Sequence, residues 1–255
     1  MLMKRYLAAN WKMFKTAEQA HKTAKDIITN IQAKLQTNDE VIIFPPFTAL
    51  GSVFKVIQNI SQIQLGGQNF YPAEQGAFTG EISPDMLIDA GCTYSIIGHS
   101  ERRHTFQESN DFVAQKVHMG LEKNLAIILC IGETLDQRQN GLLEKTLNSQ
   151  LDSVLNNLSP SDIKNRLLIA YEPVWAIGTG KVAQKEDIRE AHSLIRSILK
   201  KFLEQKSDII PILYGGSVKS ENSSEILSLD NVNGVLVGGA SLDAQTFSDI
   251  IINSK

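Results

Sequence analysis

The sequence predicts a single α/β domain over residues 1–255, a (β/α)8 barrel with eight parallel strands ringed by helices. Eight short apolar segments recur along the chain, and helical patterns lie between them. Nearly continuous apolar segments are typical of strands that are buried on both faces of a parallel sheet. No linker rich in Pro, Gly or Ser divides the chain. An open doubly wound sheet also satisfies the alternation, but eight similar units favour closure into a barrel.

The predicted strands share a short length and a high content of β-branched and aromatic residues. In chain order they are residues 6–9, 41–44, 63–65, 94–97, 126–131, 167–171, 209–214 and 234–237.

Helical spacing of apolar residues separates these strands. Thr16 and Gln19 resemble a capping box before the first apolar helical face. Ser83 and Pro84 place a cap residue before a proline at the first helical position. Further helical faces are predicted over residues 142–155, 188–202 and 244–252.

Composition narrows the class of protein. Hydrophobic residues make up 42% and charged residues 21%, which is typical of a globular protein. The net charge of −3 and the absence of a basic run argue against a nucleic-acid or membrane partner. The N-terminus lacks the apolar core of a signal peptide, and no apolar run is long enough to span a bilayer. We therefore expect a cytoplasmic protein.

The two cysteines, Cys92 and Cys130, are too few for a disulfide framework. We expect both to be small buried residues in a reducing compartment. No spacing among the histidines and cysteines predicts a metal site. His21, His104, His118 and His192 have no partner that the sequence identifies, and we interpret them as structural.

Polar residues and glycines gather directly after the predicted strands. In a parallel barrel the carboxyl ends of all strands meet at one face, where active sites are built. The sequence therefore predicts one polar site at that face. Its candidate residues are Asn10, Lys12, His99, Glu101, Glu172, Gly215, Gly216, Ser217, Gly238 and Gly239.

Glu172 follows the sixth strand and precedes Pro173, which favours an extended backbone at Glu172. A carboxylate at the barrel mouth near Trp175 and Ile177 is partly desolvated, which raises its basicity and suits a general base. The same position also suits an exposed carboxylate at a strand end.

An apolar run followed by Gly-Thr-Gly-Lys predicts a lid that closes over a ligand and hinges at its ends. A surface loop with one buried tryptophan is the alternative. The predicted lid comprises Pro173, Val174, Trp175, Ala176, Ile177, Gly178, Thr179, Gly180, Lys181, Val182 and Ala183.

His99 precedes a predicted helix start at Ser100, and the positive end of a helix favours a neutral imidazole. A neutral imidazole can donate a hydrogen bond to a carbonyl oxygen. A core histidine bonded to backbone groups is the alternative. Lys12 can stabilise a phosphate or an enolate oxygen, with Asn10 orienting it and Glu101 as counter-charge, although a lone lysine also suits a solvated surface.

The glycine pairs after the seventh and eighth strands, Gly215-Gly216 and Gly238-Gly239, can bring backbone N–H groups close to a phosphate. Either pair alone is typical of a tight turn. Two pairs in successive loops favour a phosphate site.

Seven segments, spread over the whole chain, resemble the triosephosphate isomerase family. They are AANWKM (8–13), GGQNFYPAEQGAFTGEIS (66–83), IIGHSERR (96–103), CIGE (130–133), AYEPVWAIGTGK (170–181), YGGSV (214–218) and GVLVGGASL (234–242).

The resemblance implies a TIM barrel that interconverts dihydroxyacetone phosphate and D-glyceraldehyde 3-phosphate through an enediol(ate), without cofactor or metal. It implies that Glu172 is the base and that neutral His99 polarises the carbonyl, a pairing for which this family is the standard worked case. Lys12, with Asn10 and Glu101, would stabilise negative charge. Gly178, Ser217, Gly238 and Gly239 would hold the phosphate.

The resemblance also implies a homodimer in which Thr79, on the loop 68–81, lies near the partner's catalytic residues. Val182 stands where a threonine is common in relatives, at the end of the lid, and Phe14 stands where small or polar residues are also found. Two other interpretations stay open: another phosphate-binding barrel enzyme, and a barrel with a binding role in place of catalysis or beside it.

Overall fold

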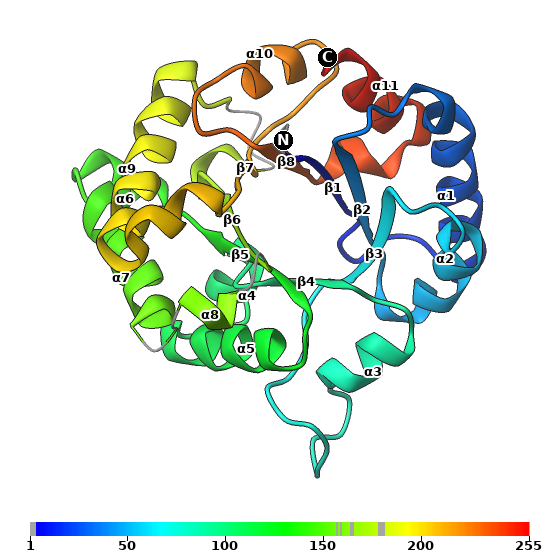
Figure 1. The fold of residues 1–255 in the computed structure, drawn as a ribbon, viewed down its shortest axis with the longest axis horizontal. Coiled ribbons are helices and arrows are strands. Elements are labelled where there is room, and N and C mark those ends of the chain that lie inside the picture. Colours follow the sequence, from blue (N-terminus) through cyan, green and yellow to red (C-terminus); the bar gives the residue numbers. More distant parts are fainter. Residues whose placement is uncertain (1–3, 157, 159, 164–165, 178–181, 255) are drawn as a thin grey trace.

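The computed structural model describes residues 4–156, 158, 160–163, 166–177 and 182–254. In this part of the chain, eight parallel strands follow one another around a closed barrel, with helices outside them (Figure 1). β1 closes the ring, because Tyr6 pairs with Glu40 of β2 on one side and with Gly234 of β8 on the other. The predicted TIM barrel is confirmed, and the open sheet is excluded.

The strands lie close to their predicted positions. They are β1 (Arg5–Asn10), β2 (Asp39–Phe44), β3 (Ile63–Gly67), β4 (Tyr94–Ile97), β5 (Ala126–Ile131), β6 (Leu167–Tyr171), β7 (Ile212–Tyr214) and β8 (Gly234–Val237).

The seventh strand begins three residues later than predicted. Ile209 ends the 3₁₀ helix Glu204–Ile209, and the strand starts only at Ile212. Pro211 has no N–H to donate to a ladder, although its carbonyl accepts from Ile169 at 2.9 Å. The predicted start at residue 209 is therefore wrong, because apolar character alone does not reveal the missing donor.

The helices run between successive strands. They are α1 (Ala17–Ile31), α2 (Leu50–Ile57), α3 (Pro84–Asp89), α4 (Ser100–His104), α5 (Asn110–Glu122), α6 (Leu135–Gln139), α7 (Leu143–Leu155), α8 (Pro160–Ile163), α9 (Lys185–Leu203), α10 (Ser223–Leu227) and α11 (Ala244–Asn253). The predicted caps are confirmed: Thr16 and Gln19 form a reciprocal capping box, and the Ser83 hydroxyl accepts from the Met86 N–H.

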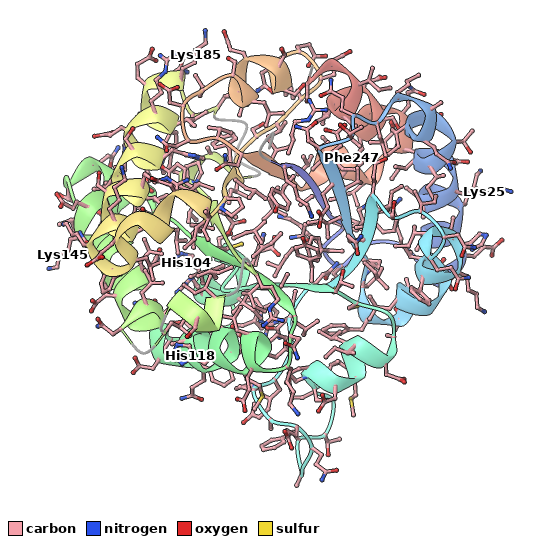
Figure 2. All side chains as sticks on the ribbon, in the orientation of Figure 1. Lys25, His104, His118, Lys145, Lys185 and Phe247 are labelled. Atoms are coloured by element: carbon pink, nitrogen blue, oxygen red, sulfur yellow. The ribbon has the colours of Figure 1, made fainter. Side chains whose placement is uncertain are left out.

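Each strand is buried on both faces because its residues alternate between two apolar layers. On β6, Leu168 and Ala170 belong to the cluster inside the barrel, whereas Leu167, Ile169 and Tyr171 pack towards the helices. Side chains fill the interior of the ring, and long charged side chains extend from the outer helices (Figure 2). Cys92 and Cys130 are buried free thiols, as expected. In the described residues no helix combines the length and apolarity that crossing a membrane requires.

His192 of α9 is a buried histidine that we expect to make stability depend on pH. Its Nδ1 lies 3.0 Å from the Asn231 carbonyl oxygen, and its ring meets the Tyr171 ring edge-on. Burial lowers the pKa of His192 from 6.5 to about 4, against the hydrogen bond to Asn231. The folded pKa lies below the unfolded one, so the unfolded chain binds a proton first as the pH falls.

The contribution of His192 is therefore complete above pH 6.5 and is lost as the pH falls towards 4. The loss amounts to about 3 kcal/mol over this window. We expect His192→Asn, which keeps a donor for the Asn231 carbonyl, to reduce the change in the free energy of unfolding with pH. Urea unfolding of both proteins at pH 7.5 and 4.5, at one protein concentration, measures this change. An equal loss of unfolding free energy in the variant and the wild type would contradict this role of His192.

Candidate active site

The alternation of the strands directs two polar side chains into the mouth of the barrel. Leu168 and Ala170 point into the barrel, so Glu172, two residues further on, takes the next inward position. Asn10 follows Tyr6 and Ala8 in the same way at the end of β1. Parallel strands bring these carboxyl ends together, which places both polar groups above the apolar interior.

Glycines occupy inward positions beside Glu172 and leave room for it. A methyl group built on Gly132, after β5, would lie 1.7 Å from the Glu172 carbonyl oxygen. A methyl group on Gly215, after β7, would lie 2.9 Å from the Glu172 Cγ. Both glycines are therefore required by close approach of the neighbouring backbone and side chain.

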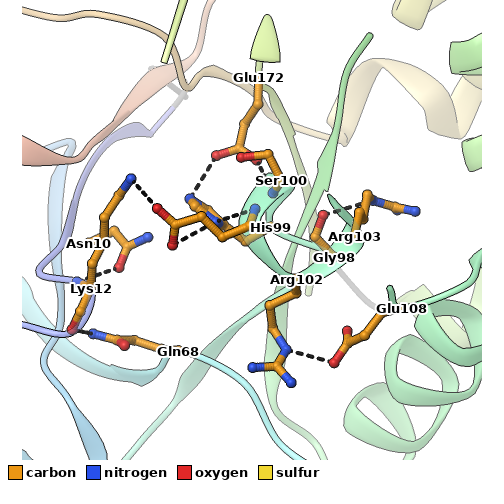
Figure 3. A network of polar contacts seen from close by, with 11 residues as sticks. Asn10, Lys12, Gln68, Gly98, His99, Ser100, Arg102, Arg103, Glu108 and Glu172 are labelled. Carbon is orange, nitrogen blue, oxygen red and sulfur yellow. Dashed lines mark hydrogen bonds and ion pairs between the residues drawn. The ribbon is translucent and has the colours of Figure 1, made fainter. Parts of the chain in front are cut away.

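The Glu172 carboxylate is buried and held by two donors (Figure 3). Its Oε1 lies 3.1 Å from His99 Nε2, and its Oε2 accepts from the Ser100 N–H at 2.9 Å. Burial raises the pKa of Glu172, but His99 and the Ser100 N–H stabilise the carboxylate and bring the pKa below its ordinary value. Desolvation acts in the expected direction, but in this arrangement His99 and the Ser100 N–H together outweigh it, so the pKa of Glu172 falls.

His99 is the N-cap of α4, so the predicted helix start after it is confirmed. Its Nδ1 accepts from the Glu101 N–H at 3.3 Å. Burial lowers the pKa of His99, and the adjacent Glu172 carboxylate raises it above its ordinary value. The contact with the Glu101 N–H requires an unprotonated Nδ1 and is compatible with a neutral ring whose Nε2–H donates to Glu172.

Lys12 faces Glu172 and His99 from the other side of the mouth. Its Nζ lies 2.7 Å from Glu101 Oε1, and its N–H donates to Asn10 Oδ1 at 3.0 Å. Its backbone has a φ of 51°, a left-handed conformation that costs energy for a residue with a Cβ. Gln68 holds this turn, since its Nε2 donates to the Lys12 carbonyl at 2.8 Å and to the Phe44 carbonyl at 2.9 Å.

These groups line a cavity of about 410 Å³ at the carboxyl face, within the size range of small-molecule sites. Its wall also includes the glycine segments after β7 and β8. The predicted residues that line it are Asn10, Lys12, His99, Glu172, Ala176, Ile177, Gly215, Gly216, Ser217, Gly238 and Gly239. Glu101 reaches the site through Lys12 and His99 and does not line the cavity.

Comparison with known proteins identifies the family. The family model described as triosephosphate isomerase matches residues 5–254. A triosephosphate isomerase of Lawsonia intracellularis is 50% identical over 252 residues, which cover 98% of each chain. That of Nitratidesulfovibrio vulgaris is 48% identical over 250 residues, 98% of this chain and all of that protein. That of Chloroherpeton thalassium is 43% identical over the full length of both.

The chain belongs to the triosephosphate isomerase family.

The lid that the apolar run and its Gly-Thr-Gly-Lys segment predict is only partly described in this triosephosphate isomerase homologue. Gly178, Thr179, Gly180 and Lys181 lie outside the described residues. Val174, Trp175 and Ala176 form a 3₁₀ turn after Pro173, and Ala176 and Ile177 line the cavity. On the far side Val182 is exposed and Ala183 is buried. The function of this segment as a lid stays a prediction.

Several residues that support the triosephosphate isomerase site were not predicted from the sequence. Ser100 contributes a backbone N–H to Glu172, which no side-chain pattern reveals. Arg103 donates to the Gly98 carbonyl at 2.8 Å and to the Cys130 carbonyl at 3.2 Å, joining the ends of β4 and β5. Gly132 could have been found, because it continues the inward positions of β5. Gln68 could not, since its partners lie far away in sequence.

No metal site accompanies this triosephosphate isomerase site in the described residues. Their His, Cys, Asp and Glu side chains form no group of three that could hold an ion.

Proposed function

We propose that this cavity interconverts dihydroxyacetone phosphate and D-glyceraldehyde 3-phosphate by proton transfer through an enediol(ate), the reaction of glycolysis and gluconeogenesis that the family's name denotes. The observation that carries the proposal is the meeting of Glu172, His99 and Lys12 around one cavity at the carboxyl face of the barrel. The reaction needs a base, a hydrogen-bond donor and a cation, and these three side chains supply them.

Glu172 acts as the base. Its carboxylate takes the proton from the carbon beside the carbonyl and returns it to the neighbouring carbon. In the described arrangement His99 and Ser100 lower its pKa. Movement of the carboxylate off these donors and into the cavity removes both interactions, and burial then favours the protonated form. The site therefore allows Glu172 to become a stronger base where the substrate is bound.

His99 polarises the carbonyl of the substrate. A neutral ring with its proton on Nε2 can donate to a carbonyl oxygen and stabilise negative charge as it develops. The same ring can exchange protons between the two substrate oxygens. The Glu101 N–H at Nδ1 supports this role, because it fixes the tautomer that points Nε2–H into the site.

Lys12 stabilises the negative charge of the phosphate and of the enediolate, with Asn10 beside it and Glu101 as its counter-charge. Backbone groups of Gly178, Ser217, Gly238 and Gly239 hold the phosphate. A lid over residues 173–183 excludes water and suppresses elimination of phosphate from the intermediate. The reaction uses no cofactor and no metal.

The direct test is the conversion of glyceraldehyde 3-phosphate by the purified chain, coupled to NADH-dependent reduction of the product. Fast turnover that depends on Glu172 supports the proposal. A folded protein without turnover would favour the alternative of a barrel with a binding role and no catalysis.

We further propose that residues 1–255 form one domain, located in the cytoplasm, and that two copies form a homodimer. Large apolar side chains are exposed on neighbouring loops, and such surfaces often mark interfaces. Met13 and Phe14 follow β1, Phe47 follows β2, and Phe78 lies on the loop after β3. These strands are neighbours in the barrel, so the loops lie on one side of the molecule.

The loop between β3 and α3 extends away from the barrel (Figure 1) and carries the exposed Thr79. Its shape is maintained by the Tyr71 and Phe78 rings, whose centroids are 4.3 Å apart. We expect Thr79→Asp to raise the dissociation constant of the dimer at least about tenfold, because a charge would be buried at the interface without a partner.

Sedimentation from micromolar to nanomolar protein measures this effect, with Thr29→Asp on the exposed face of α1 as the control. Shortening the loop should weaken the dimer further. Equal dissociation in the Thr79 and Thr29 variants would count against the proposed interface.

A further inference from the structure

Arg138 connects helix α9 to Glu133, a buried residue close to the candidate active site. It belongs to α6 and lies outside all seven sequence motifs. Its Nη2 lies 2.6 Å from Asp187 Oδ1 and 2.7 Å from Glu190 Oε2, both on α9. Its Nη1 lies 3.9 Å from Glu133 Oε1, and this buried nitrogen has no hydrogen-bond partner among the described residues.

Glu133, which follows β5, holds the chain on both sides of Glu172. Its fully buried Oε1 accepts from the Tyr171 hydroxyl at 3.0 Å and from the Trp175 indole N–H at 2.8 Å. Its backbone carbonyl accepts from the Val174 N–H at 3.1 Å. Tyr171 precedes Glu172, and Val174 and Trp175 follow it. One acidic residue therefore holds the backbone and side chains that directly precede and follow Glu172.

The charge of the Glu133 carboxyl group affects the strength of its hydrogen bonds to Tyr171 and Trp175. Burial raises the pKa of the carboxyl above its ordinary value, whereas the Trp175 and Tyr171 donors and the Arg138 guanidinium act in the opposite direction. An ionised carboxylate makes stronger hydrogen bonds than a neutral carboxyl group. Among the described residues, Arg138 is the cation paired with Glu133.

Arg138 is itself held in place from the opposite side. Asp187, which bonds its Nη2, also accepts from the Gln184 N–H at 3.0 Å and so caps the start of α9. Glu190 makes the second contact to Nη2 one helical turn further on. The guanidinium is thereby fixed between the amino-terminal turns of α9 and the buried carboxylate of Glu133.

We propose that Arg138 is a positioning residue for Glu172: its guanidinium holds the buried Glu133 carboxyl group in place, and Glu133 fixes Tyr171 and Trp175 on either side of the base. The inference rests on the proposed function of Glu172. Arg138 neither lines the cavity nor contacts the base; it reaches the base through Glu133 and through the neighbouring Tyr171.

Arg138→Gln removes the charge and keeps a polar side chain of similar reach. We expect kcat to fall about tenfold with little change in KM, since a small displacement of a catalytic group has a large effect on rate. The acidic limb of the kcat profile should move to higher pH, because Glu133 then takes up a proton more readily. Arg138→Lys should restore part of both effects by returning a cation.

Arg189→Gln is the matched control. Arg189 lies on the exposed side of α9, with Glu186 at 3.9 Å, and its loss should leave kcat and the pH profile unchanged. A double-mutant cycle that combines Arg138→Gln with Glu133→Gln tests whether the effect of Arg138 depends on Glu133. If Arg138 acts through Glu133, the double variant should be no slower than Glu133→Gln alone.

The chain has two tryptophans, so the indole N–H signal of Trp175 can be assigned in an NMR spectrum with Trp175→Phe. Arg138→Gln should shift that signal and leave the Trp11 signal in place. This readout does not depend on Glu172 being the base, so a failed base assignment and a failed Arg138 link are distinguishable. An unshifted Trp175 signal, unchanged kcat in a folded Arg138→Gln protein, or additive effects in the cycle would overturn the proposal.

Discussion

Glu172→Gln should lower kcat by about 1000-fold and leave KM within a small factor of the wild-type value, in keeping with the usual contribution of a general base. The amide has nearly the same shape and retains an oxygen that can accept from the Ser100 N–H. It cannot take a proton from carbon. The binding groups around Lys12 and the glycine segments are untouched, so the loss falls on the chemical step. The coupled isomerase assay measures both constants.

Glu186→Gln is the control for loss of a negative charge, since Glu186 is largely exposed on α9. Glu172→Asp provides a second test. It retains the carboxylate but withdraws it by one methylene, so we expect binding to persist and most of the rate to be lost. Near-normal turnover in either Glu172 variant, in a folded protein, would remove Glu172 from the role of base.

Gly132→Ala should reduce kcat by about 100-fold, because an error of about 1 Å in the position of a catalytic group has an effect of this size. The added methyl group would lie 1.7 Å from the Glu172 carbonyl oxygen and 2.6 Å from its carbonyl carbon. Both are backbone atoms, which cannot rotate away. The ends of β5 and β6 must therefore separate, and Glu172 must move with its strand.

Stability should also fall, by about 1–3 kcal/mol, as is usual for overpacking in a tightly packed region. Gly51→Ala is the matched control, because Gly51 lies on α2 and a methyl group there meets nothing within 4 Å. That variant should be unchanged in kcat and slightly more stable, since alanine favours a helix. Wild-type kcat in Gly132→Ala would show that Glu172 tolerates displacement and would contradict the close packing of this position.

Much of the architecture could be predicted because it follows from local patterns. Apolar strands that alternate with helical faces indicate a barrel, and the capping box of Thr16 and Gln19 predicts that a helix begins at Ala17. The single large error in the strands, the start of β7, arose where an apolar run contains Pro211, which cannot donate to the sheet. Composition describes burial well, but the hydrogen-bond ladder determines where a strand begins.

The residue types of the site were also visible in the sequence, since Asn10, Lys12, His99 and Glu172 each follow a strand. Their grouping was predicted from one geometric fact, that parallel strands end at one face. The resemblance to a known family supplied the reaction and the roles, which the residue types alone left open.

The sequence by itself therefore determined the barrel, the face that carries the site and the chemical groups available there. Only the tertiary structure decided how those groups act on one another. The pKa of Glu172 is lowered by the imidazole of His99 and the backbone N–H of Ser100, at the start of α4 and some 70 positions earlier in the chain. The space that Glu172 occupies depends on Gly132 and Gly215, which directly follow the two neighbouring strands β5 and β7. Distances of a few ångströms between residues remote in sequence set these energies, and no local pattern contains them.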